Sequence, residues 1–188
     1  MELMVVVAIV AILAVMAAPS YRDMIDRYRL RAATDDLVSV MSNARANAVK
    51  LDREVNVSFG NHDSGWCMGA KAAVAPTGGL PAGTASACDC TDNAPACVVD
   101  GETLLVPAGK HADVDISGTF PDAVIFDGNL GLLKTDSSAT APVLESRTID
   151  LRSPSGKYTA QVVVRPLGQA TVCVPSPSPS MAGVPACQ

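Results

Sequence analysis

The sequence predicts an α+β fold in which one long N-terminal helix packs on an antiparallel β-sheet. Three observations predict this fold. No glycine and only one proline interrupt residues 1–52, where apolar residues recur at the spacing of a helix. From residue 54 the apolar period changes to two, the period of a half-buried strand. Turn sequences of the hairpin type then follow, and a helix that leads into consecutive strands is the α+β arrangement.

Composition limits the class of protein. A chain of 188 residues is long enough for one domain with a real core. The net charge of −5 and the pI of about 4.9 argue against a polyanion such as DNA as the default partner. Six cysteines suit an oxidising compartment better than the cytosol. We therefore expect the domain to lie outside the inner membrane.

Residues 1–21 are the apolar half of the predicted helix. Sixteen uncharged apolar residues run from Leu3 to Ala18. They would span ~24 Å, short of the ~30 Å hydrocarbon layer of a bilayer. A cleaved signal is disfavoured, because no basic segment precedes the block and helical sequence follows it. Arginines after the block would place the domain in the cytoplasm by the positive-inside rule, whereas the cysteines indicate the opposite side. We expect a missing basic leader, and thus a natural start upstream of Met1.

Residues 22–53 form the amphipathic half of the helix. Apolar side chains at steps of three and four predict one buried stripe, made of Leu30, Ala33, Leu37, Met41, Ala44, Ala48 and Leu51. Pro19 should kink the helix between the two halves, because it removes one backbone hydrogen bond. The continuous helix would be ~75 Å long, more than its own domain needs. Its first half should therefore be buried in lipid or in other subunits; a plain membrane anchor with a stalk is the simpler alternative.

Residues 54–188 are predicted to form the β-rich domain. Strands are expected at 55–59, 66–71, 103–106, 114–120, 123–126, 147–152, 158–164 and 170–174. The sequences FDGNLG (126–131) and SPSGK (153–157) predict hairpin turns. Residues 72–97 are rich in Ala, Gly, Pro and Thr and are expected to be an irregular insertion, which is either a surface loop or a partner-contact surface. The Pro/Ser-rich tail after Cys173 is expected to be extended.

Several of these segments resemble one known family. ELMVVVAIVAILAVMAAPSY resembles the N-terminal helix of type IV pilins and type II secretion pseudopilins. LVSVMSNARANAVKLDREVNVSF (37–59) resembles the narrower GspH/FimT group of minor pilins and minor pseudopilins, whose AR-x-x-AVK pattern leads into the first strand. AVIFDGNLGLL and QVVVRPLGQATVC are similar to later strands of that group. The resemblance implies a pilin-like fold in which the hydrophobic half of the helix protrudes.

The resemblance also assigns roles at the N-terminus. Glu2 matches a glutamate that a neighbouring subunit's N-terminal amine neutralises in the filament core, which sets the axial register of assembly; the simpler interpretation is a helix-start charge stabilised by the helix dipole. Pro19 matches the family's helix-kinking proline. The family's leader, its cleavage glycine and the first mature residues have no counterpart before Glu2. Restoring about four residues would lengthen the apolar helix to ~30 Å; as written, the chain could not be processed or N-methylated.

The implied partners follow from the same resemblance. They are other major and minor pilins or pseudopilins, the inner-membrane assembly platform, and a prepilin peptidase that acts on the full-length precursor. The expected location is the inner membrane, as a single-pass protein with a periplasmic domain, and afterwards a pilus or pseudopilus. The resemblance does not choose between a type IV pilus and a type II secretion system, nor between priming and capping of the filament.

The sequence predicts neither a catalytic site nor a cofactor. Glycine-rich phosphate loops, HExxH and GxSxG are absent, and both His62 and His111 are expected to be solvated. A zinc site at Cys88, Cys90 and Cys97 is disfavoured because CxC is not the usual CxxC knuckle and the compartment is oxidising. No metal is expected.

The cysteines are instead expected to form disulfides. Cys173 and Cys187 enclose 13 residues, and closing this loop would contribute ~3 kcal/mol. Pilins, which the chain resembles, commonly tie down their C-terminal region in this way, so we expect this bridge. Cys67, Cys88, Cys90 and Cys97 then pair among themselves. Cys67 with Cys88 or Cys90 would pin the insertion to the sheet, and the choice stays open.

Reception of DNA is the alternative function. Some FimT-type members bind DNA through two arginines in a GRxR pattern, and the corresponding residues here, 168–171, contain neither arginine. The remaining candidate contacts are Arg165, Lys157 and Arg152, with Arg147 nearby. Two to four phosphate contacts on an acidic protein would bind weakly and would be sensitive to salt. The alternative interpretation of these residues is solvated charge at a strand edge.

Overall fold

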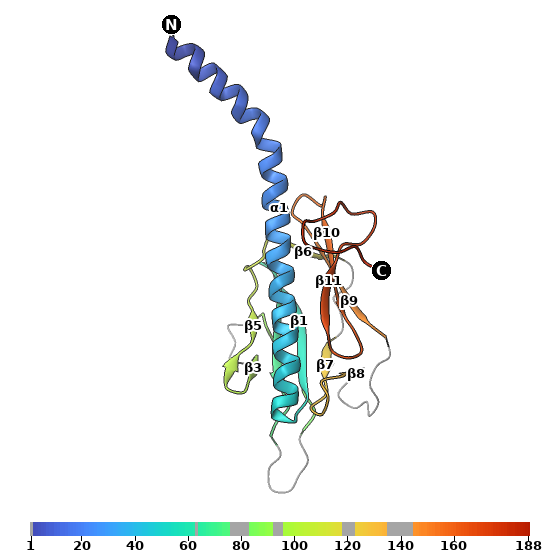
Figure 1. Cartoon of the computed structure of the whole chain (residues 1–188). Coiled ribbons are helices and arrows are strands. Elements are labelled where there is room, and N and C mark those ends of the chain that lie inside the picture. Colours follow the sequence, from blue (N-terminus) through green and yellow to red (C-terminus); the bar gives the residue numbers. More distant parts are fainter. Residues whose placement is uncertain (1, 63, 76–82, 92–95, 118–122, 135–144) are drawn as a thin grey trace.

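The structure, a computed structural model, describes residues 2–62, 64–75, 83–91, 96–117, 123–134 and 145–188. One helix, α1 (Glu2–Leu51), runs beside two antiparallel sheets (Figure 1). The strands are β1 (Val55–His62), β2 (Gly65–Ala72), β3 (Val98–Val99), β4 (Glu102–Thr103), β5 (Leu105–Val106), β6 (Asp115–Ser117), β7 (Val124–Phe126), β8 (Leu133–Lys134), β9 (Arg147–Arg152), β10 (Thr159–Val164) and β11 (Ala170–Cys173). The chain therefore has the α+β, pilin-like architecture that its sequence predicts.

Among the α1 side chains that the structure describes, those buried against the sheets lie in the second half of the helix. Its buried side chains recur at steps of one, three and four: Leu30, Ala33, Thr34, Leu37, Val40, Met41, Ala44 and Ala48. Leu51 is half-buried against the same core. The helix ends because Asp52 adopts a positive φ of 49° and the Arg53 amide donates to the Ala48 carbonyl at 3.1 Å. The other half protrudes from the domain, and α1 bends between the two parts (Figure 1).

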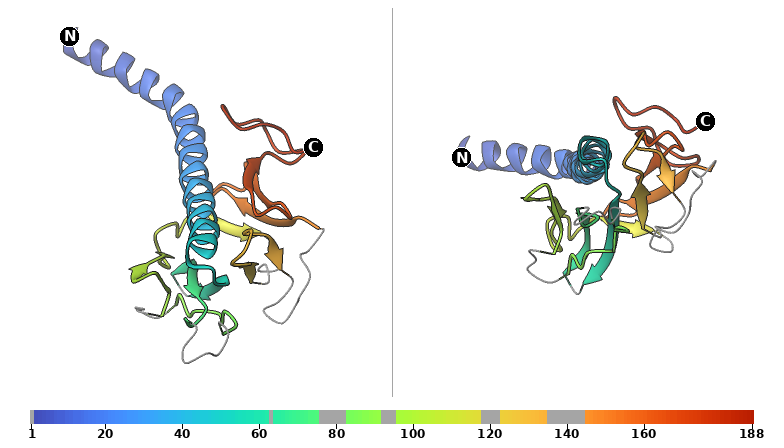
Figure 2. Two further views of the ribbon diagram at one scale, coloured as in Figure 1. Left: turned by 60° about the horizontal axis from the view of Figure 1, so that its bottom comes forward. Right: turned by 90° about the horizontal axis from the view of Figure 1, so that it is seen from below.

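The two larger sheets form the wall on which α1 rests. One has the strand order β5-β2-β1-β7-β8, the other β11-β10-β9-β6, and β3 and β4 form a separate hairpin. Seen along the helix, the sheet that contains β1 and the sheet that contains β10 lie next to each other (Figure 2). Aliphatic side chains on alternate positions of β9 and β10 close the core under α1: Ile149, Leu151, Ala160, Val162 and Val164.

Some strand predictions differ from the structure. The segment expected at 103–106 is divided between β4 and β5, because the Leu104 amide bonds to the Cys97 carbonyl and its carbonyl accepts from Ala70. The strand expected at 114–120 is described only as β6, and residues 118–120 lie outside the described residues. Strands β3 and β8 were not predicted, because two residues are too few to show an alternating pattern. The hairpin turns after Phe126 and after Arg152 are present, between β7 and β8 and between β9 and β10.

The described part of the insertion covers the outer face of β1 and β2. The Cys88 amide donates to Ser58 Oγ at 2.9 Å, and Asn56 Nδ2 donates to the Ala85 carbonyl at 3.2 Å. Glycines in the strands make room for this layer: a Cβ at Gly69 would lie 2.3 Å from Cys97 Sγ, and one at Gly60 would lie 3.0 Å from Cys67 Sγ. Consequently both faces of β1 are covered, one by α1 and the other by a layer rich in sulfur.

Candidate functional site

The protruding half of α1 exposes an apolar surface. Eight large apolar side chains there are 53–82% exposed: Leu3, Met4, Val5, Val6, Val7, Ile9, Val10 and Ile12. Contiguous apolar surfaces of this kind mark sites of protein or membrane contact. Glu2 begins α1, but its side chain and that of Pro19 lie outside the described part. In the portion of the chain that is described, no helix combines the length and the apolar character that a membrane span needs.

An apolar ridge continues from this half to the domain. Tyr21, Met24 and Tyr28 lie at helical steps of three and four and are 64%, 56% and 74% exposed. They border grooves on both flanks of the helix. A groove of about 740 Å³ lies between α1 and the C-terminal segment, and we call it the C-terminal groove; its lining residues are Ser20, Tyr21, Met24, Arg27, Tyr28, Arg31, Met181, Ala182 and Val184. A second groove, of about 300 Å³, includes Ile25 and Ala32.

The wall of the C-terminal groove opposite α1 is a closed loop. Cys173 is bonded to Cys187, the pairing expected from the sequence, and the Cys187 amide donates to the Val174 carbonyl at 3.0 Å. Arg31 Nη1 donates to the Ala182 carbonyl at 3.2 Å, which ties the loop to α1. Met181, a residue of the loop, is buried. The groove is therefore bounded by two fixed elements.

Ion pairs along α1 fix the helix to the domain. Lys157 pairs with Asp23, Arg29 with Asp113 at 2.6 Å, and Lys50 with Asp100 at 2.7 Å in the turn that joins β3 to β4. The hydrogen bond from Lys157 lowers the pKa of Asp23, and that bond raises the pKa of Lys157. The hydrogen bond between Lys50 and Asp100 likewise raises the pKa of Lys50 and lowers the pKa of Asp100. These pairs are exposed, so each stabilises the docked helix modestly and is weakened by salt.

The expectation that His111 is solvated is wrong. Its side chain is 10% exposed, its Nε2 lies 2.7 Å from Asp36 Oδ2 on α1, and its ring stacks on Trp66. Lys110 Nζ approaches the same carboxylate at 2.8 Å. Burial raises the pKa of Asp36, but the hydrogen bonds from Lys110 and His111 outweigh burial and leave that pKa below its usual value. The cluster joins α1 to the segment before β6. The His62 side chain lies outside the described part of the chain.

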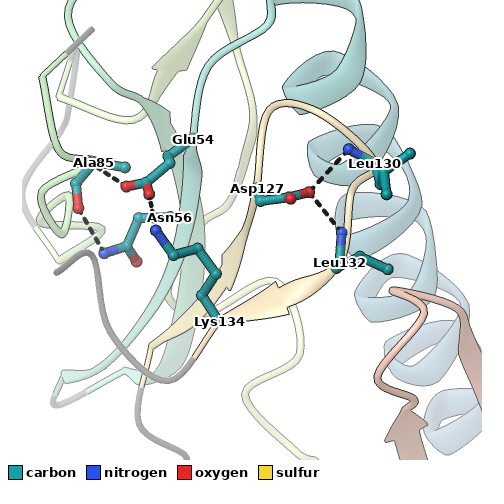
Figure 3. A network of polar contacts seen from close by, with 7 residues as sticks. All are labelled: Glu54, Asn56, Ala85, Asp127, Leu130, Leu132 and Lys134. Carbon is teal, nitrogen blue, oxygen red and sulfur yellow. Dashed lines mark hydrogen bonds and ion pairs between the residues drawn. The ribbon is translucent and has the colours of Figure 1, made fainter. Parts of the chain in front are cut away.

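A second polar cluster holds the insertion on the sheet. Glu54 pairs with Lys134, and both side chains are largely buried (Figure 3). The Ala85 amide donates to Glu54 Oε2 at 3.4 Å, and the Ala85 carbonyl accepts from Asn56. In the neighbouring turn, Asp127 Oδ1 accepts from the amides of Leu130 and Leu132 (Figure 3). The clusters at Glu54 and at Asp127 act on backbone groups, so their role is structural.

All six cysteines are in disulfides. Cys67 is bonded to Cys90, one of the two partners that the sequence left open, and Cys88 is bonded to Cys97. Because a disulfide sulfur is not a thiolate, these cysteines cannot serve as zinc ligands. Among the described residues, no group of three His, Cys, Asp or Glu side chains is arranged to hold a metal ion.

The candidate DNA contacts lie at two ends of β10. Arg152 is paired in register with Thr159 at the start of the strand, close to Lys157, whereas Arg165 follows its end. Lys157 and Arg165 are eight positions apart, which is about 26 Å along an extended chain. Lys157 is bonded to Asp23, and Arg152 Nε donates to the Gly156 carbonyl at 3.3 Å. The structure therefore brings two of the three residues together and leaves the third apart.

Sequence reasoning missed the apolar ridge and the Asp36 cluster. The ridge had a visible signal, because Tyr21, Met24 and Tyr28 have helical spacing but lie before the first residue of the buried stripe. The bond between Asp36 and His111 joins residues 75 positions apart and leaves no periodic signal.

Comparison with protein families gives a match over most of the chain. The family described as type II transport protein GspH matches residues 33–168. The matched range begins in the docked half of α1 and ends in the turn after β10. No curated protein and no solved structure matches the chain significantly.

Proposed function

The chain belongs to the family of type II transport protein GspH, and from this premise we propose that it assembles through α1 into a pilus-like filament. The family supports the role of a minor pilin or pseudopilin, a structural subunit rather than an enzyme, in a secretion or pilus system, and it suggests a periplasmic location in a pseudopilus. Beyond the family role, we propose a route of assembly, a location of the subunit before assembly, and a role for each part of α1.

The exposed apolar half of α1 is the observation that carries the proposal. Eight side chains between Leu3 and Ile12 are more than half exposed in the isolated subunit. Burying them would contribute on the order of 10 kcal/mol before the costs of association are subtracted. The domain offers no cover for them, since the first buried residue among the α1 side chains that the structure describes is Leu30. Neighbouring helices of other subunits would supply that cover.

We propose an inner-membrane stage before assembly. The apolar half would be held by lipid with the domain on the periplasmic side, and it would then move from lipid into the filament. Glu2 would set the axial register, because a carboxylate in an apolar bundle is costly unless a neighbouring amine pairs with it. Pro19 would let α1 bend between the bilayer and the filament. The subunit would act in priming or at the tip.

Replacement of the glutamate tests the register role. In a chain produced with a prepilin leader, Glu2→Ala should leave the protein in the membrane fraction but lower the number of filaments, because the paired carboxylate is lost. Glu102→Ala, which removes an exposed carboxylate from β4, is the matched control and should leave filament number unchanged. Normal filament number with Glu2→Ala would refute the register role.

Two further measurements separate the alternatives. Co-purification with type II secretion components or with type IV pilus subunits identifies the host system. A gel shift of the purified chain with duplex DNA at low salt tests the receptor function. Two separate basic ends on an acidic protein predict no retardation. Retardation that disappears with Arg165→Glu and Lys157→Glu would favour the receptor instead.

A further inference from the structure

We propose that the C-terminal groove is the docking site for the protruding helical half of a second copy of this chain. The inference rests on the proposed assembly function and adds the place of contact. It also gives the loop closed by Cys173 and Cys187 a second role, as one wall of an interface.

The shape of the groove suits a helix. Its α1 wall extends from Ser20 to Arg31, which is about 17 Å or three helical turns. The ridge residues Met24 and Tyr28 project into it from one side, and Val184 and Ala182 face them from the other. Helices pack with their axes about 8–10 Å apart when ridges of side chains enter grooves. Three turns of an apolar helix would bury the ridge that the isolated subunit leaves exposed.

Both arginines of the groove have hydrogen-bond partners at its walls. Arg27 Nε donates to the Asp23 carbonyl at 3.1 Å, and its guanidinium lies over the Tyr158 ring at 5.3 Å. Arg31 donates to the Ala182 carbonyl. The arginine heads are thus held at the walls while their stems line the groove. None of the nine lining residues is acidic, and the only charged side chain before Arg22 is Glu2, so the occupant and the groove are electrostatically compatible.

The chain itself carries both halves of the interface. The groove and the exposed residues between Leu3 and Ile12 are different patches on one subunit, so two copies would join head to tail, with one helical half and one groove left for other subunits. Both walls, at 20–31 and 181–184, lie outside the matched range 33–168. The groove is therefore built from parts of this chain that the family match does not include.

Site-specific photo-crosslinking tests the proposal in the full chain. A photoreactive phenylalanine replaces Tyr28 on one wall or Ala182 on the other, in cells that also produce a second copy with a different tag. Both positions should yield a crosslinked dimer that contains both tags. Trypsin should release the crosslinked segment of the second copy as the peptide that ends at Arg22, because no lysine or arginine lies between Met1 and that residue.

Exposed leucines provide matched controls. The same replacement at Leu130 or Leu167, which are 66% and 62% exposed, should give no such dimer. Crosslinks from position 28 or 182 to any other segment, to lipid, or to a different protein would overturn the proposal, and so would equal yields at the leucines. Filaments that still form while these crosslinks are absent would refute the groove but keep the assembly function. Crosslinks at both wall positions without any filaments would refute the assembly function alone.

Discussion

The two halves of α1 should respond in opposite ways to mutation. Leu37 lies in the middle of the buried stripe and is fully buried. Leu37→Ala removes buried methyl groups and leaves a cavity, so we expect the free energy of unfolding to fall by about 3 kcal/mol, within the range of about 2–5 kcal/mol for such changes. Val7 lies in the protruding half and is 65% exposed. Val7→Asp should change the free energy of unfolding by less than about 0.5 kcal/mol.

The only tryptophan of the chain provides the assay. Trp66 is 4% exposed, and its Nε1 donates to the Val114 carbonyl at 2.7 Å, so its fluorescence reports the packed core. Urea titration of the full chain in detergent should show a lower midpoint for Leu37→Ala with an unchanged slope. Co-purification with a second tagged copy should fall for Val7→Asp, provided that the variant is recovered in the membrane fraction.

Two results would refute the reasoning. A loss below about 1 kcal/mol for Leu37→Ala would show that the second half of α1 is not part of the domain core. An equal loss of stability for Val7→Asp would show that the protruding half folds back onto the domain. Leu130→Ala, an exposed leucine in the turn between β7 and β8, is the control for side-chain loss without a cavity.

Three further predictions concern the bonds that hold the domain together. Cys173→Ser combined with Cys187→Ser should lower the free energy of unfolding by ~3 kcal/mol, because the unfolded chain regains the entropy of an open loop, and this is measured by urea titration. Asp36→Asn should destabilise at pH 7. The pKa of Asp36 is lowered in the folded state, so the stability that its carboxylate contributes is fully present above the unfolded pKa of about 3.9. That contribution is lost as the pH falls through the folded pKa. The free energies of unfolding of the wild type and the variant should therefore converge when both are measured at decreasing pH. Lys134→Met should cost about 2 kcal/mol by leaving Glu54 unpaired, and adding Glu54→Gln should restore most of that loss in a double-mutant cycle.

The sequence predicts those features that recur along the chain. The buried stripe from Leu30 to Ala48 was predicted correctly because a helix repeats its inward face every three or four residues. The hairpin turn at FDGNLG was predicted because glycine and aspartate have local conformational preferences. In contrast, the partner of Cys67 and the contact between Asp36 and His111 depend on how distant segments meet. No local conformational preference encodes a contact between distant segments, so these two features can be identified only from the folded structure.

The continuity of α1 has a mechanical consequence. No loop interrupts the helix between Glu2 and Leu51, so a thrust or pull on its free end reaches the core through continuous, though bent, helix. The docked contacts from Leu30 to Ala48 extend over about 27 Å and would be loaded in shear, many at once rather than one after another. The β-rich domain would therefore move together with α1 as one unit when force acts along the helix.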